Sequence, residues 1–151
     1  MPYIPFYELL PAIAKMETRV ITLLSSSNEF DLPEGEYAFV ELYCNECDCR
    51  RVFLSVMKEG VQEPVAIISW GWETEQFYIE WYGKYDSDII KEMKGSTLLM
   101  TARQSVISKN VLRMFNHVLL NDSFYTSRIK KHYDFFRKEL NKNIHTYENN
   151  M

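Results

Sequence analysis

The sequence predicts an α+β domain: an antiparallel sheet meander of about five strands, short N-terminal helices, and two longer C-terminal helices packed on one face. Three observations lead to this fold class. Strand-like segments follow one another at close spacing through the first half of the chain, as they do in antiparallel sheets. Segments with a helical period come afterwards. The composition is ordinary for a globular protein, with 46% hydrophobic and 25% charged residues among 151.

The N-terminal segment combines two short helical turns with a first strand. Pro5 and Pro11 are each followed by residues that can continue a helix, as expected for proline at a first helical position. Residues 18–24 are rich in β-branched side chains and are predicted to form a strand. Residues 25–36, with three serines, a proline and a glycine, are expected to form a loop.

Four further segments show the alternation or the β-branched character of strands. They are residues 37–44, 51–58, 64–71 and 76–82. The last segment belongs to a stretch rich in Trp and Tyr, which we interpret as part of a sheet core and its helix interface. The alternative is a stacking platform for bases or sugars, but the glutamates of this stretch argue against nucleic acid.

The remainder of the chain has a helical pattern. A short helix is expected over residues 87–93, and a longer one over residues 102–120 carries apolar side chains at intervals of three and four. Asn121 or Asp122 is a suitable N-cap for the last helix. The sequence therefore predicts that two C-terminal helices pack on the sheet.

We expect a single domain over residues 1–142, followed by a disordered tail at 143–151, where no periodicity is present. Apolar runs are of strand length only, well short of the roughly 20 residues of a membrane helix. The N-terminus lacks the basic and apolar regions of a signal peptide. These features predict a soluble, cytoplasmic protein that does not enter a membrane.

The charges are unevenly distributed. Residues 1–102 carry 8 Lys and Arg against 17 Asp and Glu, which gives −9, whereas residues 103–142 carry 9 against 3, which gives +6. A basic segment can bind nucleic acid, but a basic helix packed on its own acidic domain gives the same count. Because the net charge of the chain is −4, we favour the second interpretation and expect no nucleic-acid partner. A protein partner and the oligomeric state are left open.

Cysteine occurs only as Cys44, Cys47 and Cys49, an odd number within six residues, which is a poor framework for disulfides. A C-x2-C pair closing a turn can present two thiolates to one tetrahedral ion, and a third cysteine can fold back to it. Zinc is the favoured ion because it prefers thiolate ligands. Three thiolates around Zn²⁺ leave a net charge near −1, which the neighbouring Arg50 and Arg51 can offset.

A closed structural zinc site needs a fourth ligand. We prefer His132, which lies on the apolar stripe of the last helix, although a hydrogen-bonded core histidine is the alternative. His117 is expected to be solvated, and His145 lies in the tail. Asp48 and Glu46 are other possible ligands, but residues so close in sequence to the cysteines are sterically awkward.

Two segments resemble a family of bacterial proteins known only as a domain of unknown function. They are Tyr43-Cys44 with Cys47-Asp48-Cys49-Arg50-Arg51-Val52, and Ile129-Lys130-Lys131-His132-Tyr133. The resemblance covers under a fifth of the chain. It implies that the cysteines and the His-Tyr pair belong to one shared design and meet in space, and it implies no activity.

The leading hypothesis is a zinc-binding domain with a structural metal and a protein-interaction role. Phosphate-binding glycine loops, H-E-x-x-H and nucleophile elbows do not occur in the sequence. One alternative is a metal-dependent hydrolase with water at an open zinc position and Asp48 or Glu46 as the base. Another is a redox protein that uses Cys44 and Cys47, with neighbouring arginines lowering a thiol pKa. Whether the chain is an enzyme is left open.

Overall fold

The structure is a computed structural model that describes the backbone of residues 3–149 and the side chains of residues 3–142. The strands are β1 (Tyr3–Pro5), β2 (Arg19–Leu23), β3 (Gly35–Cys44), β4 (Arg51–Lys58), β5 (Ala66–Gly71) and β6 (Gly95–Leu98). The helices are α1 (Phe6–Leu9), α2 (Pro11–Glu17), α3 (Glu75–Tyr82), α4 (Ser87–Met93), α5 (Ser108–Met114), the π-helix η1 (Phe115–Leu119) and α6 (Ser123–Asn149). The predicted α+β class is confirmed.

The six strands form one antiparallel sheet in the order β1-β3-β4-β5-β6, and β2 also pairs with β3. Both β1 and β2 lie along the same edge of β3, where β2 pairs with residues 35–39 and β1 with residues 42–44. Tyr3 is therefore directly opposite Cys44. This register brings the N-terminal strand to the end of β3, where the cysteine-rich loop begins.

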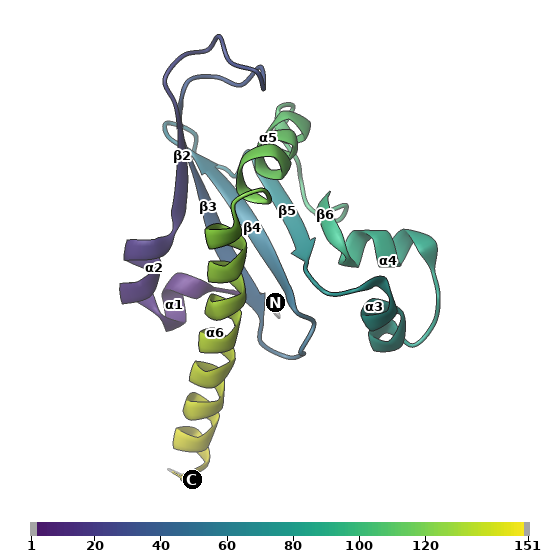
Figure 1. Cartoon of the computed structure of the whole chain (residues 1–151). Coiled ribbons are helices and arrows are strands. Elements are labelled where there is room, and N and C mark those ends of the chain that lie inside the picture. The colour runs from purple at the N-terminus through teal and green to yellow at the C-terminus, as the bar shows by residue number, and fades with distance from the viewer. Residues whose placement is uncertain (1–2, 150–151) are drawn as a thin grey trace.

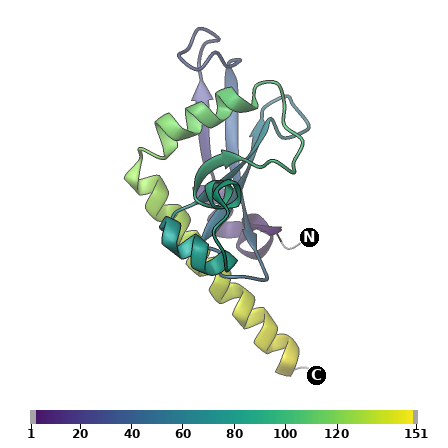
Figure 2. The ribbon, with the colours of Figure 1, turned by 90° about the vertical axis from the view of Figure 1, so that its right-hand side faces the viewer.

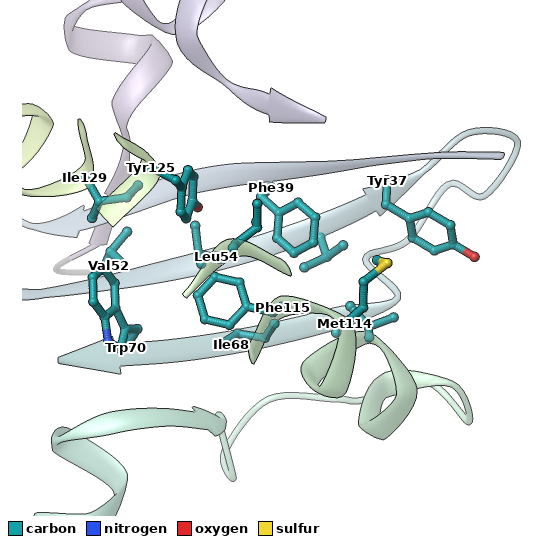
Figure 3. Packing of buried hydrophobic residues seen from close by; sticks show 14 of the residues in the cluster. Tyr37, Phe39, Val52, Leu54, Ile68, Trp70, Met114, Phe115, Tyr125 and Ile129 are labelled. Carbon is teal, nitrogen blue, oxygen red and sulfur yellow. The ribbon is translucent and has the colours of Figure 1, made fainter. Parts of the chain in front are cut away.

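One face of the sheet carries the core. Helices α5 and α6 cross this face, and the last turns of α6 project beyond the sheet (Figures 1 and 2). Alternate residues of the strands point toward these helices, and their side chains interdigitate with those of the helices (Figure 3). The residues labelled there are Tyr37, Phe39, Val52, Leu54, Ile68, Trp70, Met114, Phe115, Tyr125 and Ile129.

The strand predicted over residues 76–82 is wrong, because these residues form helix α3. Thr74 caps the helix by accepting a hydrogen bond from the Phe77 N–H at 3.1 Å, and Gly83 ends it in the left-handed conformation. Tyr78 is buried in a small cluster with side chains of α4. The alternation of aromatic residues was thus a misleading signal, since local capping and packing on α4 determine the conformation.

The last strand of the sheet is instead β6, which pairs with β5 after the α3–α4 excursion (Figure 1). The helix predicted over residues 102–120 is shorter than expected, because α5 begins only at Ser108. Before it, the Gln104 side chain accepts a hydrogen bond from the Ile67 N–H and donates one to the Ile67 carbonyl, each at 3.0 Å. Pairing with β5 replaces the first turns of the predicted helix.

Helix α6 begins where the sequence predicts. Asp122 is its cap, because one carboxylate oxygen accepts hydrogen bonds from the N–H groups of Phe124 and Tyr125 at 3.0 and 3.2 Å. The helix runs to Asn149, past the domain end predicted at residue 142. Side chains beyond that residue, including His145, lie outside the described ones, so the tail stays a prediction. Within the described part of the chain, no helix has the length and hydropathy to cross a membrane.

Candidate metal centre

The three cysteines gather where β3 turns into β4. Cys44 is the last residue of β3, and Cys47 and Cys49 follow in the loop. All three sulfurs lie within 4.8 Å of one another, and the Sγ atoms of Cys44 and Cys47 are 2.9 Å apart. The thiols are free. Cys44 and Cys49 are buried, and Cys47 is partly exposed. The loop therefore presents three sulfurs to one point, as the spacing predicts.

Helix α6 holds this loop by two side chains. The Tyr133 hydroxyl donates a hydrogen bond to the Asp48 carboxylate and accepts one from the Arg50 N–H at 3.1 Å. One turn further along, the Arg137 guanidinium donates to the Cys47 carbonyl at 2.6 Å. These contacts join the cysteine loop to a helix more than 80 residues away in the sequence.

A second clamp comes from α3. The Tyr78 hydroxyl donates to the Arg50 carbonyl at 2.8 Å, and the Arg50 side chain pairs with Glu73 at 3.3 Å and with Asp48 at 3.7 Å. Arg50 has a positive φ of 50°, an uncommon conformation for a residue with a side chain. Its side chain thus pairs with two carboxylates, and the predicted role of its charge beside the thiolates stays a prediction.

Arg51 behaves differently from its neighbour. It is only 8% exposed, donates to the Ser69 hydroxyl at 2.7 Å and lies over the Phe53 ring. Its Nε has no hydrogen-bond partner. Its charge acts on Cys49 and lowers the pKa of that thiol against the larger effect of burial. Of the two arginines that we expected to offset the charge of the thiolates, Arg51 is the one whose charge acts on a cysteine.

Burial has the largest effect on the pKa of the Cys47 and Cys49 thiols. It raises the pKa of Cys47 well above the ordinary value of 9.0, and the hydrogen bond with Cys44 adds to this effect. Burial also raises the pKa of Cys49, although the Cys47 hydrogen bond and Arg51 oppose it. Reactive redox cysteines have lowered pKa values, so this environment does not favour the redox alternative.

His132 does not join the cysteine group. It is buried, with Nδ1 at 2.7 Å from the Glu41 carboxylate and Nε2 at 3.4 Å from Glu17, and its ring stacks on Phe6 with centroids 4.5 Å apart. The same Glu41 oxygen accepts a hydrogen bond from the Tyr43 hydroxyl at 2.6 Å. The arrangement offers no support for His132 as the fourth ligand, and the alternative of a hydrogen-bonded core histidine describes it.

The reason lies in the geometry of α6. Adjacent residues of an α-helix point about 100° apart, so His132 and Tyr133 cannot both face the cysteine loop. Tyr133 faces the loop and His132 faces β3. His117 is also remote from the cysteines, with Nε2 at 4.0 Å from Glu29. Sequence reasoning missed Glu41, whose signal is a carboxylate on the face of β3 that also carries Phe39 and Tyr43.

Comparisons with protein-family models, curated proteins and solved structures gave no match. The resemblance to a bacterial family therefore stays a prediction. The site is interpreted from its own geometry and chemistry.

A polar pocket of about 430 Å³ lies beside the loop. Its lining residues are Asp48, Arg50, Trp72, Glu73, Lys130, Tyr133, Asp134 and Arg137. Three of its side chains are basic and three acidic, and Arg50 already pairs with two of the carboxylates. None of the described cysteines lines this pocket, but Asp48, which lies between Cys47 and Cys49 in the sequence, does.

We expect His132→Ala to destabilise the fold strongly, because Glu41 would remain buried without its partner. Removing one member of a buried pair costs about 3 to 5 kcal/mol of unfolding free energy. Urea unfolding measures this loss. The control is His117→Ala, whose side chain is 63% exposed and should change the free energy by less than about 0.5 kcal/mol. Equal effects of both variants would contradict the role assigned to His132.

The pH dependence of stability should carry the signature of His132. Burial lowers the pKa of this imidazole, but its hydrogen bond and attraction to Glu41, with a smaller effect of Glu17, outweigh burial and raise the pKa above 6.5. Its stabilising contribution is complete below pH 6.5 and is lost as the pH rises through the raised value. Urea unfolding from about pH 5.5 to 8.5 should show this decline in the wild type and a smaller decline in His132→Gln. If the free energy of unfolding fell equally with pH in both proteins, His132 would not be the cause of the decline.

Proposed function

We propose that this chain is a zinc-binding domain in which Cys44, Cys47 and Cys49 hold a structural metal, and that the domain serves protein interaction. The observation that carries the proposal is the grouping of three thiols within 4.8 Å beside a buried guanidinium that has no carboxylate partner. Such a combination is costly without an ion, because a buried cation needs an opposite charge.

Charge balance supports a divalent ion. Among the residues that the structure describes, Arg51 forms no ion pair, and its Nε lacks a hydrogen-bond partner. Three thiolates around Zn²⁺ carry a net charge of about −1, which Arg51 neutralises. A monovalent ion such as Cu⁺ would leave an excess negative charge. Iron–sulfur clusters normally require more cysteines than this chain has. Zinc fits the donor set best.

The surroundings of the loop support a structural role for the metal. Tyr133 and Arg137 join the loop to α6, and Tyr78 joins it to α3. An ion that orders the loop therefore also fixes the two helices that hold it. Because the metal binds the folded loop, its binding free energy stabilises the fold.

The surface of α6 supports the interaction role. Phe124 is 85% exposed and Phe135 is 39% exposed. Both border a pocket of about 260 Å³ that also includes Arg128 and Lys131. Aromatic residues and arginine are enriched where proteins contact one another, so this part of α6 is the surface that we assign to a partner.

One distance favours a second candidate function. The Sγ atoms of Cys44 and Cys47 lie 2.9 Å apart. An oxidant would therefore form a disulfide between these two cysteines more readily than between either of them and a distant thiol. A thiol redox protein is therefore the alternative. It predicts purified protein without metal and with three thiols that react with a thiol reagent.

Metal content and its removal test the proposal. The full chain, purified without a nickel column, should contain about one zinc ion per chain by elemental analysis. A strong chelator and Cys49→Ala should each lower the melting temperature by about 10 °C, as a loss of about 3 kcal/mol does in a domain of this size. Asn45→Ala, at an exposed position of the same loop, is the control and should retain metal and stability. Metal-free protein with an unchanged melt would overturn the proposal.

The two arginines offer a matched pair of variants. Arg51→Met should weaken zinc affinity by about tenfold or more, because it removes the charge that neutralises the centre. Arg50→Met should weaken it by less than about threefold, since Arg50 already pairs with carboxylates. Competition with a chromogenic chelator measures both affinities. The reverse order would show that charge balance by Arg51 is the wrong explanation.

A further inference from the structure

The three-cysteine group has no fourth ligand among the described residues. The histidines, cysteines and carboxylates whose donor atoms meet within 4.8 Å are Cys44, Cys47 and Cys49 alone. A zinc ion bound to proteins takes four ligands as a rule, and a site with three protein ligands holds water or another molecule in the fourth position.

The other side chains that could complete the site are held elsewhere, except Glu46, which is exposed in the loop and is sterically awkward because it lies between Cys44 and Cys47 in the sequence. Asp48 accepts a hydrogen bond from Tyr133 and pairs with Arg50 at 3.7 Å. His132 lies between two glutamates, and His117 is directed to Glu29. To reach the sulfurs, His132 would have to leave the Glu41 carboxylate buried without its imidazole partner, with only the Tyr43 hydroxyl bonded to it, which is costly.

Access to the sulfurs is one-sided. Cys44 and Cys49 are 3% and 2% exposed, respectively. Cys44 accepts a hydrogen bond from the Glu46 N–H at 3.4 Å. Only Cys47 is partly exposed. A molecule from solvent therefore approaches the group at Cys47, while the other two sulfurs are buried.

Charge selects the class of ligand. The ion, three thiolates and Arg51 sum to about zero, so an uncharged fourth ligand keeps the buried centre neutral, whereas an anion adds a buried negative charge. Neutral imidazole is a good ligand for zinc. We propose that the fourth position is open and exchangeable, and that it accepts a neutral nitrogen donor of the imidazole type from outside the chain. This inference rests on the proposed function.

Cobalt(II) makes the fourth ligand visible. The metal-free full chain is loaded with Co²⁺, whose sulfur-to-cobalt absorption in the near ultraviolet reports the thiolate ligands and whose visible bands report the fourth ligand. Imidazole is then added, and azide is added to a second sample. We expect imidazole to shift the visible bands saturably and azide to bind at least tenfold more weakly. Equal binding of azide would overturn the argument from charge.

Two outcomes separate this inference from the function on which it rests. Loss of the near-ultraviolet band in the wild type would overturn the metal site itself. A normal band without any imidazole shift would leave the metal site standing and overturn the open position. The variant His145→Ala is the matched control: a shift that appears only in this variant would mean that the chain supplies its own fourth ligand, which also overturns the inference.

Discussion

The contact between His132 and Glu41 determines how α6 lies on the sheet. Both side chains are almost fully buried, and each satisfies a polar group that would otherwise be costly in the core. A rotation of α6 or a shift by one turn would separate them. Apolar packing tolerates small adjustments, whereas a buried ionisable pair requires one geometry. The surrounding core can therefore be almost entirely apolar while α6 still has a single register on the sheet.

Fixing this register has an effect on the neighbouring residue. Because His132 points to β3, Tyr133 must point to the cysteine loop, where it contacts Asp48 and the Arg50 backbone. The candidate metal centre thus depends on a contact that lies outside it. Two buried nitrogen-rich side chains have different partners in this region: the His132 imidazole lies beside two carboxylates, and the Arg51 guanidinium lies near the thiols.

Local patterns in the sequence were sufficient for much of this structure. The cysteine spacing predicted the sulfur group, because its members lie within a single loop, and alternation predicted β3 and β4. Residues 76–82 were misassigned because aromatic alternation outweighed the capping signals of Thr74 and Gly83. The partner of His132 could not be predicted, since the rotation of a helix on a sheet depends on packing between segments distant in the sequence. Glu41 was the visible clue to that rotation.

The side chain of Gln104 has a further consequence for how the sheet ends. Its amide bonds to both backbone groups of Ile67, just beyond the residues of β5 that pair with β6. An unpaired strand edge is a template for adding a strand from another molecule, and hence for aggregation. On the opposite side, β1 and β2 cover most of the length of β3. The Leu99 N–H also donates to the Ile67 carbonyl, but the Ile67 N–H is bonded to Gln104. A small residue in place of Gln104 would therefore leave this N–H of β5 open to intermolecular pairing.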